Sequence, residues 1–339
     1  MIKKIFIIII VVILILVSDY FFMINNSVNK NNQEVKFIIT KGEGVKQISK
    51  NLDQANLIRS NVFFDFYVWL KGSQTNFKAG EYVLRQNMNL KEIISELTGN
   101  KALSKEKIIK IIEGWDINDI NNYLNKNSFF VDNNFNSLAK TKISKWQFKT
   151  PKPDFLNKAP ESADLEGFLF PDTYRLFQDA TTEDLIIKML NNFDKKLTTQ
   201  MRQDIVQQNK TIYQIVTMAS IIEREVRTVD DMQTVSGLFW NRIKNGQALQ
   251  SCATLAYILG EKKTQYSLED TKVDSLYNTY QNQGLPPGPI ANPGLNAIKA
   301  AIYPKYTDYN YFLSRPDTGE TIFSKSYEEH NRNKAKYLK

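Results

Sequence analysis

The most informative stretch of this chain is residues 211–227, which read TIYQIVTMASIIEREVR. Its apolar residues recur at intervals of three and four, the spacing of one face of an α-helix. Thr211 and Gln214 stand three apart at its start, as in a capping box that closes a first helical turn. We therefore predict a helix that begins after Thr211 and runs to about Arg227.

Glu223 falls in the middle of the apolar face of this helix, whereas Glu225 falls on the opposite side. A carboxylate among apolar side chains is poorly solvated as an anion, so its pKa should rise and it can hold a proton at neutral pH. A general acid needs that property. The alternative is that Glu223 pairs with Arg227 one turn later and is structural. The apolar residues within roughly 60° of Glu223 on the helical wheel are Ile212, Val216, Ala219 and Val226.

The segments after this helix carry their own start and stop signals. Thr228 marks a second helix cap, and the helix that follows should stop at Asn245-Gly246, a pair that suits a left-handed residue. Asn292-Pro293 predicts a further helix, with the asparagine as its cap and the proline in its first position. A hairpin is predicted with strands at residues 311–314 and 321–324.

Before residue 125 the sequence repeats one pattern three times: an apolar strand, a turn, and apolar residues at helical spacing. The three helices should begin after Gly44, Asn89 and Asp116, and Asn or Asp is a favourable N-cap. Such units fit either a small glycan-binding module or an α+β packing domain. Residues 125–160 are polar and irregular, which predicts a mobile connection or a substrate-facing insertion.

The amino terminus predicts a membrane anchor. Residues 1–4 contain Lys3 and Lys4, and residues 5–24 are mostly apolar, about the twenty residues that a membrane helix requires. No small-residue cleavage site follows the run, so an uncleaved span is favoured over the alternative of a secretory signal. The two lysines predict a cytoplasmic amino terminus and place the rest of the chain on the outer side of the cytoplasmic membrane.

The charge and the rare residue types exclude several classes of function. The net charge of +8 would suit nucleic acid, anionic lipid or an anionic polymer. The lysines are dispersed and the predicted anchor directs the chain outward, so we expect no nucleic acid partner. Cys252 is the only cysteine and His330 the only histidine, so a disulfide, a zinc site and a serine-histidine triad are not indicated. No metal or organic cofactor is expected.

Taken together, several segments resemble one family, the endolytic murein transglycosylases of the YceG-like type. In chain order they are MASIIERE (218–225), GLFWNR (237–242), LQS (249–251), YNTY (277–280), GLPPGPI (284–290) and NPG (292–294). The stretch EGFLFPDTY (166–174) is similar to a further element of the family, and residues 35–104 resemble its LysM-like subdomain. The resemblance covers essentially the whole chain.

The resemblance implies a membrane-anchored lyase that cuts inside nascent peptidoglycan strands, with murein synthases as protein partners. The family's catalytic acid is the first glutamate of its A-S-I-x-E element, which corresponds to Glu223. A single acid suffices if the 6-hydroxyl of N-acetylmuramic acid attacks the anomeric carbon and leaves a 1,6-anhydro end. The same carboxylate then accepts the hydroxyl proton.

A second group of polar residues is predicted to contact the glycan or support the acid. These are Glu166, Asp172, Tyr174, Ser220, Asn241, Arg242, Gln250, Asn278 and Tyr280. Cys252-Ala253 stands where the family usually has Asp-Pro, which would weaken or retune activity if that aspartate positions substrate.

Two alternatives to a lyase stay open. One is a non-catalytic peptidoglycan-binding scaffold. The other is a lysozyme-like muramidase, which requires a second carboxylate across the cleft, for which Glu166 and Asp172 are the candidates.

The predicted fold class is therefore α+β in three parts. These are the transmembrane helix at 5–24, a LysM-like strand-helix module at 35–104, and a larger mixed α+β catalytic domain at 105–339 that includes the irregular insertion at 125–160.

Overall fold

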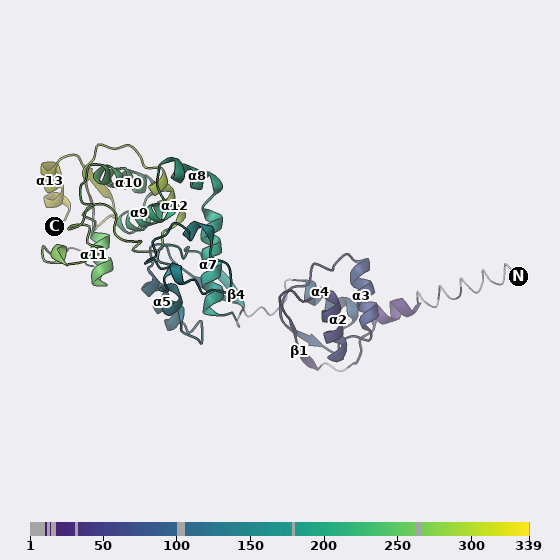
Figure 1. Ribbon diagram of the computed structural model, residues 1–339. Coiled ribbons are helices and arrows are strands. Elements are labelled where there is room, and N and C mark those ends of the chain that lie inside the picture. The colour runs from purple at the N-terminus through teal and green to yellow at the C-terminus, as the bar shows by residue number, and fades with distance from the viewer. Residues whose placement is uncertain are drawn as a thin grey trace. The chain divides into compact units, whose positions relative to one another are not determined.

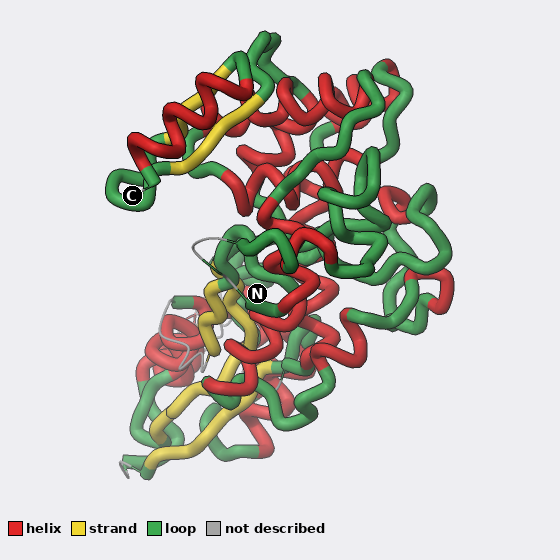
Figure 2. Tube along the Cα trace, turned by 90° about the vertical axis from the view of Figure 1, so that its left-hand side faces the viewer, coloured by secondary structure: helices red, strands yellow, loops and turns green. Residues whose placement is uncertain are grey.

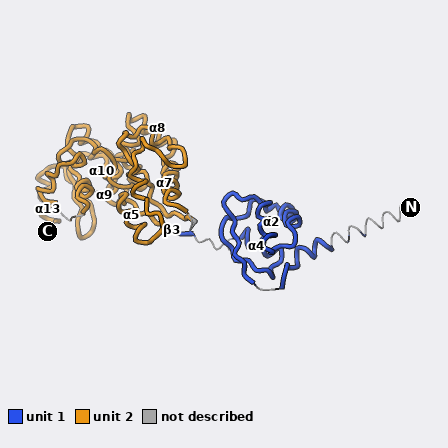
Figure 3. The backbone as a smooth tube through the Cα atoms, turned by 60° about the horizontal axis from the view of Figure 1, so that its bottom comes forward, with its two compact units in different colours: residues 1–107 blue, residues 108–339 orange. Residues whose placement is uncertain are grey.

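The computed structural model describes residues 11, 14, 18–30, 33–99, 106–177, 180–261, 263 and 266–338. The chain divides into two compact units, residues 1–107 and 108–339 (Figure 3). Helices predominate, and the described strands pair in three separate two-stranded sheets (Figures 1 and 2). The mixed α+β class predicted from the sequence is confirmed.

From residue 33 on, the described part of the first unit combines one small sheet with three helices. β1 (Glu34–Ile39) pairs antiparallel with β2 (Gly80–Arg85), and the helices are α2 (Val45–Gln54), α3 (Asn61–Leu70) and α4 (Leu90–Thr98). Fully burying one large apolar side chain contributes about 1.5–3 kcal/mol, so this core holds the unit together. Its buried members include Phe37, Ile48, Leu52, Phe64, Tyr82, Ile93 and Leu97.

All three predicted strand-turn-helix units exist, but they do not form one module. In the third unit, β3 (Glu106–Lys110) pairs with β4 (Thr173–Phe177) of the larger unit and leads into α5 (Ile117–Lys126). Asn89 and Asp116 each form a complete capping box, whereas Gly44 precedes α2 without a side-chain cap. The sequence does not predict α3, because NVFFDFYVWL is apolar nearly all round and shows no clear period.

The second unit is organised around α9 (Ile212–Glu225). Every residue from position 215 to 222 is buried, so α9 is an inner helix and not a surface helix with one apolar stripe. The predicted capping box of Thr211 and Gln214 is confirmed, and the helix ends where Val226 becomes extended. The helices in contact with α9 are α8 (Thr199–Gln207), α10 (Val229–Lys244), α11 (Cys252–Leu259) and α12 (Leu295–Ile302).

Other predicted elements of this unit are also present. Thr228 caps α10, which ends at Lys244, with Asn245 as its C-cap before the left-handed Gly246. β5 (Tyr311–Ser314) and β6 (Thr321–Ser324) form the predicted hairpin. The remaining elements are α6 (Phe135–Ala139), α7 (Thr182–Lys196), α13 (Tyr327–Tyr337) and short 3-10 helices at Ile143–Lys145, Asp154–Leu156 and Asp270–Lys272.

The segment at 125–160 has little regular structure, but several of its side chains are fixed in the fold. Phe135, Ile143 and Phe155 are buried in the main core of the second unit. Trp146 donates a 2.7 Å hydrogen bond from its ring to the carbonyl of Thr150. Much of the segment is therefore packed against the unit.

The predicted start of the helix after Asn292 is wrong by two residues. α12 begins at Leu295, and its N-cap is Gly294. Asn292 is fully buried, and its side-chain amide holds two other loops instead of capping a helix.

Most of the predicted anchor lies outside the described residues, namely residues 5–10, 12, 13 and 15–17. Residues 18–25 are helical, and Ile24 belongs to the buried core of the first unit. In the part of the chain that the structure describes, no helix has both the length and the apolar character needed to cross a bilayer.

Candidate active site

Glu223 lies in the last turn of α9 and is half-buried. Its Oε2 accepts a 2.9 Å hydrogen bond from the backbone N–H of Gly294. No donor or cation among the described residues reaches its other oxygen, and Arg224 next to it pairs with Asp116. Burial raises the pKa of Glu223 to about 7, opposed by the Gly294 hydrogen bond and assisted by the negative charge of Glu113. A large fraction of Glu223 is therefore protonated at neutral pH.

Glu113 is the second carboxylate of this site, and it was not among the residues predicted from the sequence. A Cβ placed on Gly294 would lie 2.0 Å from Oε1 and 2.3 Å from Cδ of Glu113, so the Glu113 carboxylate rests against this glycine. Gly294 thus touches Glu113 through its Cα and Glu223 through its N–H. No periodicity or capping signal distinguishes Glu113 from other exposed glutamates, because only the long-range contact with Gly294 places it here.

Asn292 holds the loop of Glu113 beside the segment before α12. The backbone N–H of Asn292 donates to the carbonyl of Trp115 at 2.8 Å, and the N–H of Gly114 donates to the carbonyl of Asn292 at 2.9 Å. The side-chain amide of Asn292 donates to the same Trp115 carbonyl at 3.0 Å. Gly114 has a φ of +80°, and a Cβ there would lie 3.5 Å from Cγ of Glu223. Glycine thus suits the left-handed backbone at this position, and the loop lies in contact with Glu223.

Glu166 is buried at the same junction, where it binds two donors and not solvent. Its Oε2 accepts from the N–H of Ile117 at 3.0 Å, and its Oε1 accepts from the side-chain amide of Asn292 at 2.9 Å. Burial raises the pKa of Glu166 well above the ordinary carboxyl range, with the hydrogen bond from Ile117 acting against the rise. The two bonds lock the start of α5 to the loop before α12.

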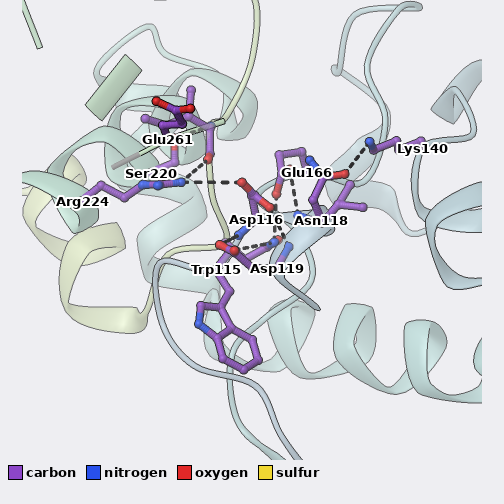
Figure 4. A network of polar contacts seen from close by, with 12 residues as sticks. Trp115, Asp116, Asn118, Asp119, Lys140, Glu166, Ser220, Arg224 and Glu261 are labelled. Carbon is purple, nitrogen blue, oxygen red and sulfur yellow. Dashed lines mark hydrogen bonds and ion pairs between the residues drawn. The ribbon is translucent and has the colours of Figure 1, made fainter. Parts of the chain in front are cut away.

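A partly buried ion pair joins the same loop to α9. Arg224 Nη1 lies 3.7 Å from Oδ2 of Asp116, the N-cap of α5, and also donates to the carbonyl of Ile290 at 3.4 Å. Ser220 accepts the N–H of Ile290 at 3.0 Å. Figure 4 shows Arg224 reaching Asp116, with Trp115 and Glu166 in the same network. Three segments distant in sequence are thus held together around Glu223.

Glu225, two residues after Glu223, has a different set of partners. Its Oε1 accepts from the hydroxyl of Ser251 and from the N–H of Ala253 at 3.2 Å. Burial raises its pKa, and the two hydrogen bonds and the charges of Arg242 and Arg224 oppose the rise. Glu225 therefore fixes the start of α11 to the end of α9.

This geometry gives the Cys252-Ala253 pair a structural consequence. The N–H of Ala253 is one of the two donors to Glu225, and a proline at this position would lack it. Cys252 Sγ lies 3.2 Å from the hydroxyl of Tyr280, and burial raises the pKa of the thiol. The pair stands beside Glu225 and not beside Gly294.

Four of the predicted glycan-contacting residues are buried and bonded within the protein, namely Glu166, Tyr174, Ser220 and Asn278. The side-chain amide of Asn278 donates to the carbonyls of Thr271 and Val273, and Tyr174 donates to the carbonyl of Phe170. These bonds hold loops together. Contact of the four residues with substrate stays a prediction.

The other predicted residues lie on several surfaces. Asn241 and Arg242 donate to backbone carbonyls at Thr307, Leu249 and Asn310, and Gln250 is exposed with a φ of 52°.

Asp172 is exposed and accepts a 3.0 Å hydrogen bond from Asn192. The pKa of Asp172 is lowered, because this hydrogen bond, the N–H of Thr173 and the charge of Lys196 together outweigh the effect of burial.

A cavity of about 380 Å³ lies near the amino-terminal end of α9. Its walls include Asp164, Glu166, Tyr213, Tyr277 and Pro289. Tyr213 precedes Glu223 by ten residues, which corresponds to about 15 Å along a helix. The described residues contain no group of three or more His, Cys, Asp or Glu side chains that could hold a metal ion.

Comparison with known proteins agrees with the resemblance found in the sequence. The model of the YceG-like family matches residues 37–336. The endolytic murein transglycosylase of Bacillus subtilis is 33% identical over 312 residues, which cover 90% of this chain and 85% of that protein. That of Streptococcus pneumoniae is 29% identical over 325 residues, and the match covers 88% of this chain and 58% of the longer relative.

The match extends to a solved structure. The crystal structure of a YceG-like protein from Listeria monocytogenes is 32% identical, with a TM-score of 0.54, and covers 89% of this chain and 100% of the other. The predicted family is confirmed: this chain belongs to the YceG-like family.

Proposed function

We propose that this protein is an endolytic peptidoglycan lytic transglycosylase in which Glu223 is the general acid and then the general base. The observation that carries the proposal is the state of Glu223, which has one oxygen fixed by Gly294, the other without a protein partner among the described residues, and a pKa of about 7. The relatives named endolytic murein transglycosylases supply the class of substrate.

The reaction begins with the proton on Glu223. It passes to the oxygen that bridges C1 of N-acetylmuramic acid and C4 of N-acetylglucosamine as the C1–O bond breaks. The 6-hydroxyl of the muramic residue bonds to C1, and its proton passes to the Glu223 carboxylate. No water is consumed, and the enzyme returns to its starting protonation state with a 1,6-anhydro end as product.

In this proposal Glu113 acts through charge. A negative carboxylate beside Gly294 favours the protonated form of Glu223, as the direction of its effect on the Glu223 pKa indicates. The same charge stabilises positive charge that develops at the anomeric carbon in the transition state. The backbone of Gly294 contacts both carboxylates.

We further propose that the apolar run predicted at residues 5–24 anchors the protein in the cytoplasmic membrane through the part that precedes Ile24, which lies in the core of the first unit. The catalytic unit is then on the outer side, within reach of nascent strands. The support is the apolar run itself and the two lysines before it. Residues 35–104 form the LysM-like wall-binding part, in which β1 and β2 enclose two helices in the order strand, helix, helix, strand.

A muramidase is the second candidate, and Glu113 is the observation that favours it. A hydrolase needs a second carboxylate near the acid. Glu166 is less suited to that task, because both of its oxygens hold protein donors, and Asp172 is bound to Asn192 at an exposed position. Glu113 has the proximity to Glu223 that those two candidates lack.

The experiment is a digestion of purified peptidoglycan with the full-length protein, followed by mass spectrometry of the strand ends. We expect new ends to be 1,6-anhydro sugars released from within strands. Reducing ends in their place would overturn the lyase and establish the muramidase. Glycan binding with no new ends would reject both and leave a binding scaffold.

A further inference from the structure

The outward face of α3 in the first unit is unusually apolar. Val62, Phe66 and Trp69 follow one another at helical spacing and are 70%, 47% and 64% exposed, and the adjacent Leu70 is 54% exposed. We call these four residues the α3 stripe. The opposite face of the same helix, with Phe64 and Val68, is buried in the core.

The α3 stripe is an ordered surface and not a loose end of chain. The rings of Phe66 and Trp69 stack with centroids 6.0 Å apart. Asp65 is the one charged residue of α3, and its spacing from Val62 and Trp69 places it at the border of the stripe, with its Oδ1 shielded from solvent. An ordered patch of large apolar side chains indicates a surface that another apolar phase covers.

The stripe is continuous with the end of the apolar amino-terminal run. The ring of Tyr20 meets Phe66 edge-on with centroids 6.0 Å apart. Ile24 is buried in the core of the first unit, and Arg59 donates to the carbonyl of Ser27 at 2.5 Å, so this segment is fixed to the unit. The unbroken part of the apolar run, residues 5–17, ends three residues before Tyr20, and three residues span at most about 11 Å of extended chain.

We propose that the α3 stripe lies in the interfacial layer of the same bilayer that holds the amino-terminal run. A membrane around that run is within about 11 Å of Tyr20, and hence next to the stripe. Tryptophan and tyrosine favour this layer, because their rings are apolar at one end and polar at the other. Basic side chains at the border suit anionic headgroups: Arg59 lies over the ring of Phe22, and Lys71 over the ring of Tyr67.

This contact would attach the first unit to the membrane in two ways, through the amino-terminal span and through the α3 stripe. The inference rests on the anchor in the proposed function, but not on its chemistry. Two attachments restrict the unit to one height above the bilayer, where newly made strands emerge.

The test uses the full chain in vesicles of phosphatidylglycerol and phosphatidylethanolamine whose acyl chains carry bromine, which quenches tryptophan emission on contact. Comparison of wild type with Trp69→Phe isolates the emission of Trp69. We expect this emission to be lost, more with bromine near the headgroups than with bromine near the chain ends. The matched control is Trp146→Phe in the second unit. The difference between wild type and this variant gives the emission of Trp146, which should be unaffected by bromine.

Flotation of the same vesicles separates the possible failures. If the protein floats with the vesicles but Trp69 keeps its emission, the stripe does not contact lipid and the inference is overturned. The inference is also overturned if the emission of Trp69 changes only with the protein-to-lipid ratio, because a second copy of the protein then covers the stripe. If the protein does not float, the anchor in the proposed function fails as well, whereas the murein digestion still tests the chemistry independently.

Discussion

Glu223 and Glu166 are both carboxyl groups whose pKa is raised by burial, but they differ in how many of their oxygens accept hydrogen bonds from the protein. Glu166 accepts on both oxygens, from Ile117 and from Asn292. Glu223 accepts on one, from Gly294, and its second oxygen has no donor among the described residues. Burial alone therefore does not identify a catalytic acid. The number of fixed donors separates an acid that can act on a ligand from one that joins loops.

The largest effect should come from Glu223→Gln. The amide keeps the shape of the side chain and can still accept from Gly294, but it cannot donate a proton as an acid does. We expect peptidoglycan cleavage to fall by about 10²–10⁴-fold, the usual contribution of general acid–base catalysis. The rate of release of new strand ends measures it.

The matched control for that variant is Glu225→Gln in the same helix. Its amide oxygen can still accept from Ser251 and Ala253, so activity should stay near the wild-type level. If Glu225→Gln lost as much activity as Glu223→Gln, the distinction drawn from fixed donors would be wrong.

The next effect is on stability and comes from Glu166→Gln. In the variant, the NH2 group of the new amide must face one of the two N–H donors that bind Glu166, and neither donor can be exchanged for an acceptor. Ile117 donates from its backbone, and Asn292 cannot flip, because its oxygen already accepts from Leu169. We expect the free energy of unfolding of the second unit to fall by about 1–3 kcal/mol.

A urea titration in a Trp69→Phe background measures this change, because the three remaining tryptophans all lie in the second unit. Glu161→Gln at an exposed position is the control and should change little.

A smaller effect, on pH dependence, should follow from Glu113→Gln. Removal of a negative charge beside Glu223 lowers the pKa of Glu223, so the acid loses its proton at a lower pH. In the wild type, activity should fall as pH rises through about 7, and in the variant this fall should begin at a lower pH.

Gly294→Ala tests the same idea without a change of charge. Its Cβ would meet the end of the flexible, exposed Glu113 side chain and push it aside, while the N–H that binds Glu223 is retained. Both variants should move the pH profile in the same direction. A profile that moved in neither would remove Glu113 from the site.

Local signals in the sequence predicted α9 well, because a capping box and a helical period both lie within a few residues of Glu223. The same signals failed at Asn292, where an apparent helix cap serves as a long-range hydrogen-bonding residue. Glu113 could not be predicted, because only its contact with Gly294, far along the chain, places it in the site. The sequence thus defines the element that carries the acid, and tertiary contacts define what surrounds it.

The smallest effect should come from Ala253→Pro, which introduces the proline that the sequence resemblance leads us to expect here. Proline removes the N–H that binds Glu225 but is tolerated in the first turn of a helix. Glu225 keeps its bond from Ser251, so we expect a loss of about 0.5–1.5 kcal/mol in stability and no change in activity. Ala253→Ser keeps the N–H and is the control in the same urea titration. A loss of cleavage in Ala253→Pro without a loss of stability would mean that Glu225, despite its fixed donors, belongs to the catalytic chemistry with Glu223.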